Sequence, residues 1–240
     1  MTRILYELTG SENRRFSPNC WRTRMVLAHK GLACDFEPCG FTQKDKIAFS
    51  GHQSYPVLAG SDAVATDSWD IACYLEDTYR DAPSLFNDGG DGGGRAMARF
   101  INSWTDVQLH PAILRTIIFD VFERLLPEDV DYFRTDREAR FKCTLEELAA
   151  QQEARGRELP RFFAPLRNLL TRQDWIGGAA PAYGDYIVFG ALRWARCVSP
   201  FPIAPNGDPV HEWRGRMIAL AKFIAPPNNV VPSGNSANSI

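Results

Sequence analysis

The chain has 240 residues, a formal net charge of −2, and the shares of hydrophobic (45%) and charged (23%) residues that are typical of a globular protein. A near-neutral charge without a basic run excludes a general nucleic-acid binder, and the length predicts one large or two small domains. The apolar part of the first ten residues is too short for a signal peptide, and no later segment reaches the length of a membrane span. We therefore expect a cytoplasmic protein without a nucleic-acid or membrane partner.

The first part of the chain, residues 1–86, alternates short apolar runs with amphipathic segments. The expected order is a strand at 3–8, a helix at 18–31, a strand at 32–38, short strands at 55–60 and 63–67, and a helix at 68–79. A strand, a helix and a second strand in succession favour a parallel pair of strands.

A glycine-rich stretch, NDGGDGGG at 87–94, predicts a flexible linker after this first part. Beyond it the apolar residues recur at helical spacing, and residues 95–225 are predicted to form an all-helical domain. The expected helices are 95–109, 112–126, 137–157, 161–173, 185–198 and 210–224. Residues 226–240 are rich in Pro, Asn and Ser, so a disordered tail is expected there. The predicted fold class is an α/β domain followed by an all-α domain.

The six cysteines and four histidines are scattered along the chain without the spacing of metal ligands. We therefore expect no metal site, and we expect the cysteines to be reduced thiols that mostly fill the core.

The stretch FSPNCWRTR at 16–24 combines a hydroxyl, a proline and a thiol at an expected helix start. Ser17 is a plausible N-cap and Pro18 a plausible first-turn residue, so Ser17 could simply cap the helix. A helix N-terminus also stabilises an anion such as a thiolate, and a serine hydroxyl there can donate a hydrogen bond to it. Cys20, one turn inside the helix, is either an inert apolar residue or a reactive thiol. The residues of this stretch are compatible with both roles of Ser17 and with both roles of Cys20.

Two further stretches have the chemistry of a peptide-binding site. In SYPVL at 54–58, a proline opens a strand, either as an ordinary edge-strand proline or, if its peptide bond is cis, leaving the backbone of Tyr55 to pair with a ligand. In TDSWD at 66–70, Asp67 and Ser68 begin a helix. They either cap that helix or offer hydroxyl and backbone donors to a carboxylate and an acceptor to an ammonium group.

Together, these stretches resemble the glutathione transferase family, and FSPNCWRTRMVLAHKG is similar to the bacterial lignin β-aryl-etherases and the fungal etherase-related transferases. The resemblance extends from about residue 3 to about residue 225, apart from the glycine-rich stretch, and includes GFT, DSWDIACYLEDTY, LPEDVDYFR, DWIGG and PAYGDY. It implies a thioredoxin-like domain that binds glutathione, followed by a helical domain that supplies a second-substrate pocket.

The resemblance also implies roles for particular residues. Ser17 would support the glutathione thiolate, and Tyr55, before a cis Pro56, would pair with the cysteinyl part of glutathione. Asp67 and Ser68 would hold the γ-glutamyl ammonium and carboxylate groups.

The glycyl end of glutathione has no such clear partner. Ser54 is shorter than the polar residue that related transferases often carry at this position, and Gln53, Lys44 or Lys46 could replace it. One further departure is Ala182, which replaces the usual hydroxyl N-cap three residues before Asp185. This loss should lower the stability of that helix by about 1 kcal/mol.

Candidates for the second-substrate pocket are Asn19, which follows the Ser-Pro pair, and the helical residues Trp104, His110, Ile113 and Phe119. For the helical residues, ordinary packing between helices is an equally simple explanation of the spacing.

The resemblance implies a glutathione transferase whose thiolate attacks an electrophilic, aromatic substrate, with β-aryl ether cleavage as one possible reaction. It also implies a homodimer. The alternatives are a non-catalytic carrier of glutathione or aromatic ligands, and a thiol transferase that depends on Cys20.

Overall fold

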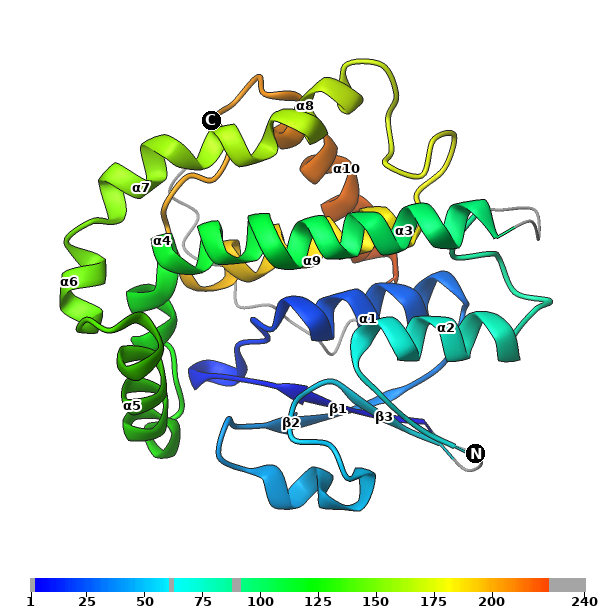
Figure 1. Cartoon of the computed structure of the whole chain (residues 1–240). Helices are drawn as coiled ribbons and strands as arrows, with labels where there is room; N and C mark the ends of the chain where they lie inside the picture. Colours follow the sequence, from blue (N-terminus) through cyan, green and yellow to red (C-terminus); the bar gives the residue numbers. More distant parts are fainter. Residues whose placement is uncertain (1–2, 61–62, 88–91, 225–240) are drawn as a thin grey trace.

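The computed structural model describes residues 3–60, 63–87 and 92–224. Figure 1 shows a small sheet at the bottom of the molecule, two helices that cover one of its faces, and a larger helical part above them. This is the predicted arrangement of an α/β domain followed by a helical domain.

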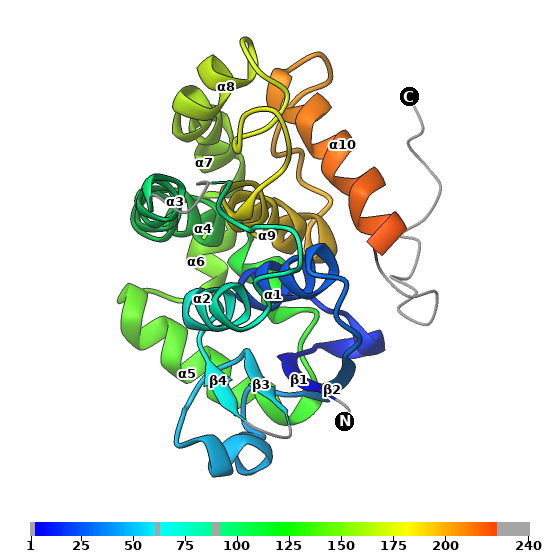
Figure 2. The ribbon, with the colours of Figure 1, turned by 90° about the vertical axis from the view of Figure 1, so that its right-hand side faces the viewer.

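The first domain is built around a four-stranded sheet in the order β2-β1-β3-β4. Its elements are β1 (Ile4–Leu8), η1 (Ser11–Asn13), α1 (Pro18–His29), β2 (Asp35–Cys39), η2 (Lys44–Ser50), β3 (Val57–Ala59), β4 (Val64–Thr66) and α2 (Ser68–Thr78). Strands β1 and β2 are parallel, as the strand–helix–strand pattern predicted, whereas β3 pairs antiparallel with both β1 and β4. Helices α1 and α2 both lie between the sheet and the helical domain (Figure 2).

The second domain consists of helices in the described residues. They are α3 (Gly93–Trp104), the π-helical turn η3 (Thr105–Leu109), α4 (His110–Phe122), η4 (Pro127–Asp129), α5 (Val130–Phe141), α6 (Leu145–Ala149), α7 (Gln152–Glu158), η5 (Leu159–Phe163), α8 (Ala164–Leu170), α9 (Tyr183–Val198) and α10 (Pro209–Ile224). Helix α3 continues through η3 into α4 as one long rod, which crosses the centre of the molecule in Figure 1.

Two expectations about this domain need correction. The expected helix at 137–157 is broken into parts of α5, α6 and α7, because Lys142 ends α5 in a left-handed conformation (φ 55°) and Thr144 caps α6. Gly93 and Gly94, counted in the expected linker, begin α3. Residues 88–91 of that linker and the whole expected tail at 226–240 lie outside the described residues.

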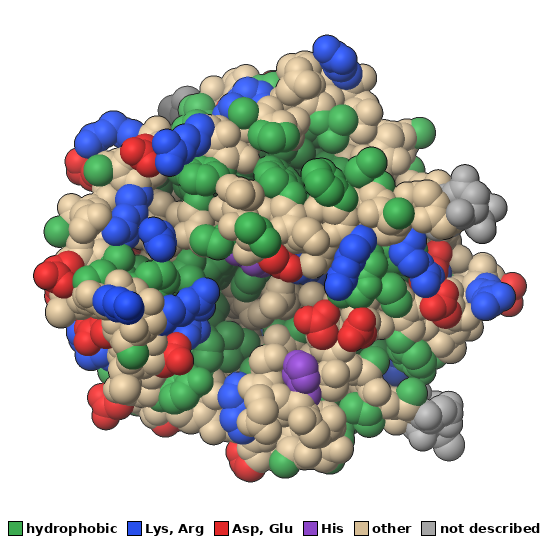
Figure 3. All heavy atoms as spheres, viewed as in Figure 1, with side chains coloured by type: hydrophobic (Ala, Val, Ile, Leu, Met, Phe, Trp, Pro, Cys, Tyr) green, Lys and Arg blue, Asp and Glu red, His purple; other side chains and the backbone are tan. Residues whose placement is uncertain are grey.

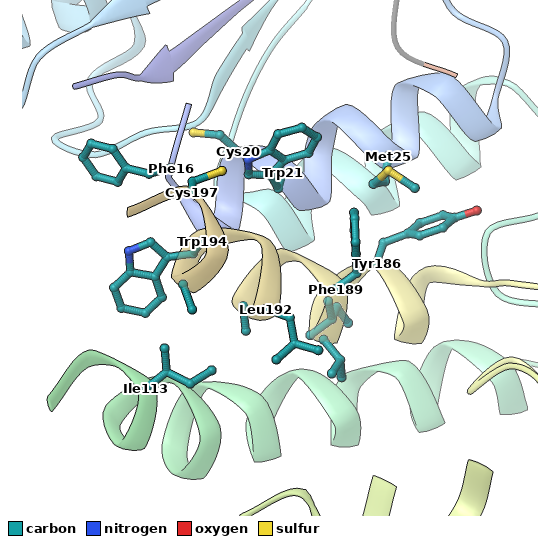
Figure 4. Close-up of a cluster of buried hydrophobic side chains, with 14 of the residues drawn as sticks. Phe16, Cys20, Trp21, Met25, Ile113, Tyr186, Phe189, Leu192, Trp194 and Cys197 are labelled. Carbon is teal, nitrogen blue, oxygen red and sulfur yellow. The ribbon is translucent and has the colours of Figure 1, made fainter. Parts of the chain in front are cut away.

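Helix α9 joins the two domains. Fourteen of its 16 residues are buried, as expected for a helix that is packed on all sides. Figure 4 shows its apolar side chains between α1 above and the α3–α4 rod below, with Trp21 close to Phe189. The rings of Trp21 and Phe189 meet edge to face with centroids 6.4 Å apart, which fixes α1 against the helical domain.

The first turn of α9 is held by Asp185 although Ala182 offers no capping hydroxyl. Asp185 is fully buried and accepts hydrogen bonds from the backbone of Ala182, Ile176 and Gly177 and from the indole of Trp213, all between 2.8 and 3.0 Å. The carboxylate half of the capping box is therefore present, and it also ties α9 to α10.

Within the described ranges, no helix has the length and apolar character needed to cross a bilayer. The same residues contain no group of three or more His, Cys, Asp and Glu side chains placed to hold a metal ion. All six cysteines are free thiols, of which Cys20, Cys39 and Cys197 are buried.

Candidate active site

A cleft opens between the two domains on the face shown in Figure 3. It consists of two cavities of about 320 and 470 Å³ that share one lining residue, Asn19, in the first turn of α1. We call the smaller one the aromatic cavity and the larger one the polar cavity. The aromatic cavity is lined by Leu8, Phe16, Ser17, Pro18, Asn19, Phe41, Lys44, Gln53, Ser54, Tyr55, Leu114, Val121, Tyr132, Phe133, Arg137 and Trp194. The polar cavity is lined by Asn19, Arg22, Asp67, Trp69, Asp70, Arg99, Asn102, Asp106 and His110.

The start of α1 lies where the two cavities meet. Ser17 is the N-cap, and its Oγ accepts a hydrogen bond from the backbone N–H of Cys20 at 3.2 Å. As the hydroxyl accepts this bond, its own proton remains available for donation to a ligand. Gly190 of α9 lies so close that a Cβ there would be 2.4 Å from the carbonyl oxygen of Pro18, so the absence of a side chain lets α9 support this helix start.

Cys20 lies inside α1, where its thiol is buried. It is 2% exposed, and burial raises the pKa of its thiol to about 12, with the nearby carboxylate of Glu7 adding to the effect and the Ser17 hydroxyl opposing it only in part. A thiol with such a pKa is almost wholly protonated at neutral pH, and the thiolate is the reactive form. The inert interpretation of Cys20 is therefore the better supported one.

We expect Cys20 to resist both alkylation and mixed-disulfide formation in the folded protein. After treatment with iodoacetamide or glutathione disulfide at pH 8, peptide mass spectrometry should find Cys20 unmodified. The partly exposed Cys73 and Cys143 serve as internal controls for reagent access. One glutathione attached to Cys20 would restore the thiol-transferase interpretation.

The start of α2 forms the other end of the site. Asp67 is the N-cap, accepts a hydrogen bond from the backbone of Trp69 at 2.8 Å, and has a positive φ of 66°. Ser68 is 2% exposed, and its carbonyl accepts a hydrogen bond from the hydroxyl of Tyr183 on α9. A non-glycine residue with positive φ is uncommon, and such strain concentrates at binding sites. The carboxylate of Asp67 lines the polar cavity.

The segment before β3 lines the opposite end of the aromatic cavity with Gln53, Ser54 and Tyr55. The Tyr55–Pro56 peptide bond is cis, and the Tyr55 hydroxyl donates to the carbonyl of Gln43 at 2.7 Å. Of the two lysines considered for this end, Lys44 lines the cavity with its ammonium group 4.5 Å from the centre of the Tyr55 ring.

Lys46 is engaged elsewhere. Its ammonium group donates to the carboxylate of Glu37 at 2.7 Å and to the carbonyl of Pro38 at 2.9 Å. Lys44 is therefore the better placed of the two lysines to meet an anionic group in the cleft.

A polar network crosses from α1 to the α3–α4 rod at the back of the polar cavity. The buried guanidinium of Arg22 donates to Asn102 at 3.0 Å and to Asp106 at 2.8 Å, and Asn102 in turn donates to Asp106 at 2.7 Å. His110 completes the network, with Nδ1 3.3 Å from the Asp106 carboxylate and its ring edge-on to Trp194 of the aromatic cavity. The network fixes the rod against the start of α1.

His110 does not have the protonation behaviour of an acid catalyst. Burial and, to a smaller extent, the Arg22 guanidinium lower the pKa of its imidazole to about 3. The side chain is therefore neutral at pH 7, and it takes part in the network as an uncharged group.

This low pKa predicts that protonation of His110 opposes folding. An unfolded histidine takes up a proton below a pKa of about 6.5, whereas the folded one does so only near pH 3. The contribution of His110 to the free energy of unfolding is thus fully present above about pH 6.5, and it is lost as the pH decreases toward 3. From pH 7 to 5.5, we expect a loss of about 1 kcal/mol from this group. Urea unfolding at both pH values should show a smaller loss in His110→Gln, and an unchanged pH dependence would contradict the assignment.

Residues of both domains form the wall of the aromatic cavity. Phe41, in the loop after β2, is surrounded by Phe16, Tyr132 and Phe133, with ring centroids 5.5 to 6.5 Å away. The loop itself is fixed by the fully buried Asp129, which accepts hydrogen bonds from the backbone of Phe41 and Thr42 and from the Thr42 hydroxyl, at 2.7 to 2.8 Å.

The structure brings together most of the residues that the sequence singled out, namely Ser17, Asn19, Gln53, Ser54, Tyr55, Asp67 and His110. Ser68, next to Asp67 in the chain, is buried and lines neither cavity. Trp104 and Phe119 line neither cavity. Ile113 is fully buried in the core, and Leu114 and Val121 of the same helix line the aromatic cavity in their place.

The residues that sequence reasoning missed are Arg22, Asn102 and Asp106 of the polar network and the wall residues Phe41, Tyr132, Phe133, Arg137 and Trp194. A partial signal for two segments of this wall was present, since GFT and LPEDVDYFR belong to the resemblance. No pattern in the sequence indicated Arg137 or Trp194.

Comparison with known proteins agrees with this geometry. Residues 13–83 match the family described as glutathione S-transferase, N-terminal domain, and residues 96–208 match glutathione S-transferase, C-terminal domain. Glutathione S-transferase U7 of Arabidopsis thaliana is 28% identical over 104 residues, which cover 42% of this chain and 44%, less than half, of that relative.

Solved structures share the fold over nearly the whole chain. Glutathione transferase GSTFuA3 of Phanerochaete chrysosporium has a TM-score of 0.82 at 23% identity, with 94% of this chain and 99% of that one covered. CsGST63524 of Ceriporiopsis subvermispora, solved in complex with glutathione, has a TM-score of 0.78 at 19% identity, with 95% and 100% covered.

Proposed function

Because the chain belongs to the glutathione S-transferase family, we propose that it is a glutathione transferase in which Ser17 supports the thiolate of bound glutathione. The observation that carries this proposal is the place of the Ser17 hydroxyl, at the N-terminus of α1 and in the wall of a cleft that is polar on one side and aromatic on the other. Calorimetry with glutathione, followed by an assay with an aromatic electrophile, tests it. Binding without turnover would indicate a carrier.

Glutathione would span the cleft from α2 to the loop before β3. Asp67 and Ser68 hold its γ-glutamyl group, the backbone of Tyr55 pairs with its cysteinyl part, and Lys44 receives its glycyl carboxylate, with Gln53 and Ser54 beside it. The free backbone N–H groups and the dipole of α1 favour the anionic form of the sulfur at Ser17. Lowering a thiol pKa by two units requires about 2.7 kcal/mol, which these groups can supply together.

The reaction is a nucleophilic substitution. The thiol proton passes to solvent, the sulfur forms a bond to the electrophilic carbon, and the bond to the leaving group breaks, so that the leaving group departs with its electron pair. The rings of Phe16, Phe41, Tyr132 and Trp194 favour an aromatic second substrate. In a β-aryl ether the leaving group is an aryloxide, which takes a proton from water. Release of a phenol from such an ether distinguishes this reaction from simple conjugation.

We also propose that the protein is a homodimer. Met97, Phe100 and Val107 on α3 and η3 are 58% to 69% exposed, and a row of large apolar side chains on one rod is typical of an interface. Sedimentation at micromolar concentration should give twice the 27.0 kDa of one chain, and Phe100→Asp should shift the protein to the monomer. A monomer in the unaltered protein would remove this proposal.

A further inference from the structure

The charged side chains that line the aromatic cavity are all cationic. They are Lys44 from the first domain and Arg137 from the second, and no Asp or Glu is among the lining residues. The polar cavity on the other side of Asn19 has charges of both signs, with three aspartates and two arginines. An uncharged aromatic substrate would need neither cation, so the two cations indicate that the cavity binds anionic groups.

Arg137 of α5 lies among the rings of the wall. Its guanidinium carbon is 4.8 Å from the ring centre of Phe133 and 5.9 Å from that of Phe41, and its side chain is 20% exposed. One terminal nitrogen pairs with the exposed carboxylate of Asp136, its neighbour in sequence. The Nε atom is buried and has no hydrogen-bond partner among the described residues. A buried donor without an acceptor is costly unless a ligand satisfies it.

The two cations serve different ends of the cleft. Lys44 lies over the ring of Tyr55, beside Gln53 and Ser54, where the glycyl carboxylate of glutathione is proposed to bind. Arg137 lies with the aromatic rings of the second domain, where the second substrate is proposed to bind. A bound glutathione would therefore neutralise Lys44 and leave Arg137 without a partner in the cavity.

We infer that the second substrate of this protein is an aromatic compound that carries a carboxylate or sulfonate group, and that Arg137 recognises this anionic group. The inference rests on the proposed function, since it assumes that the second substrate enters the aromatic cavity. The planar fork of a guanidinium matches a carboxylate or sulfonate with two parallel hydrogen bonds, and the rings on its flanks hold it in place. The rings of Phe41 and Phe133 shield the guanidinium from water in part, which strengthens the attraction between the opposite charges.

The test compares two fluorescent dyes of similar shape in the presence of saturating glutathione, which keeps Lys44 occupied. The dyes are 8-anilinonaphthalene-1-sulfonate, which is an anion, and N-phenyl-1-naphthylamine, which is neutral. In Arg137→Gln, we expect the dissociation constant of the anionic dye to rise by about tenfold or more and that of the neutral dye to stay within about twofold. Arg137→Lys, which keeps the charge, should recover part of the affinity.

Arg140→Gln is the matched control, because Arg140 is an exposed arginine on the same helix and does not line the cavity. An equal loss for both dyes would show that Arg137 acts only by packing on Phe41 and Phe133, and no loss for either dye would show that it does not face the substrate. Both results overturn the inference. Dye binding does not depend on turnover, so a protein that selects the anionic dye but conjugates nothing would contradict the proposed function while still showing that Arg137 recognises an aromatic anion.

Discussion

Replacement of Ser17 by alanine is expected to lower glutathione-dependent turnover by at least about tenfold, which corresponds to about 1.4 kcal/mol of transition-state stabilisation. The hydroxyl already accepts the backbone N–H of Cys20, so its proton is free to stabilise the thiolate, and alanine removes this donor. The pKa of the bound thiol should rise, which moves the rate profile to higher pH. Both quantities can be measured, the first as kcat/KM and the second as thiolate absorbance against pH.

The controls separate the hydroxyl from its neighbours. Ser17→Ala also removes the N-cap of α1, which costs about 1 kcal/mol of stability, so thermal unfolding must show that the variant is folded. Ser17→Thr keeps a hydroxyl and a cap and should retain more activity. Cys20→Ser should stay within about threefold of the unaltered protein, because the thiol is buried and protonated. Loss of activity in the cysteine variant alone would reject the hydroxyl mechanism.

Replacement of Asp67 by asparagine is expected to weaken glutathione binding by about 2 kcal/mol, or about thirtyfold in the dissociation constant. The reason is the loss of a charge-assisted hydrogen bond to the γ-glutamyl ammonium group. Asparagine is the sharper substitution, because it can still cap α2 and tolerates the positive φ of 66° at this position. Alanine does neither, so Asp67→Ala would mix a loss of binding with a loss of stability.

Isothermal titration calorimetry with glutathione gives the affinity directly. Asp70→Asn provides the comparison, since Asp70 lines the same cavity from the first turn of α2 but is not the N-cap of the helix. We expect a smaller effect from it than from Asp67→Asn. If the two variants bind glutathione equally well, the ammonium group is held by the general negative charge of the polar cavity and not by Asp67.

The sequence was a good guide wherever local chemistry decides the structure. Ser17 and Asp67 are the N-caps of α1 and α2 because short polar side chains before an apolar run satisfy free backbone N–H groups. The parallel pairing of β1 and β2 follows from the helix between them. These features depend on neighbours in the chain, which a reader of the sequence can see.

The wall of the aromatic cavity was harder to predict because its residues meet only after folding. An unbroken α-helical spacing predicts Trp104 and Phe119 on related faces of one rod, but the π-helical turn between them, Thr105–Leu109, shifts the face of Phe119 relative to that of Trp104. The break in the expected helix at 137–157 had a signal, since Thr144 and Glu147 form a capping box that interrupts the helical pattern. The sequence carried no such signal for Arg137, because its place in the cavity depends on a contact with Phe41, which is nearly a hundred residues away in the chain.

The three hydrogen bonds of Asp129 have a consequence for how this protein can be recombined. They fix Phe41, which the first domain contributes together with Phe16, to the helical domain that supplies Tyr132, Phe133 and Trp194. Gly40 allows this approach, because a Cβ there would be 2.8 Å from the Asp129 carboxylate. The shape of the aromatic cavity is therefore not a property that can be moved with the helical domain alone. A hybrid with the first domain of a relative would lose the ring of Phe41 and its hydrogen bonds to Asp129, unless the segment from Gly40 to Thr42 were transplanted with it.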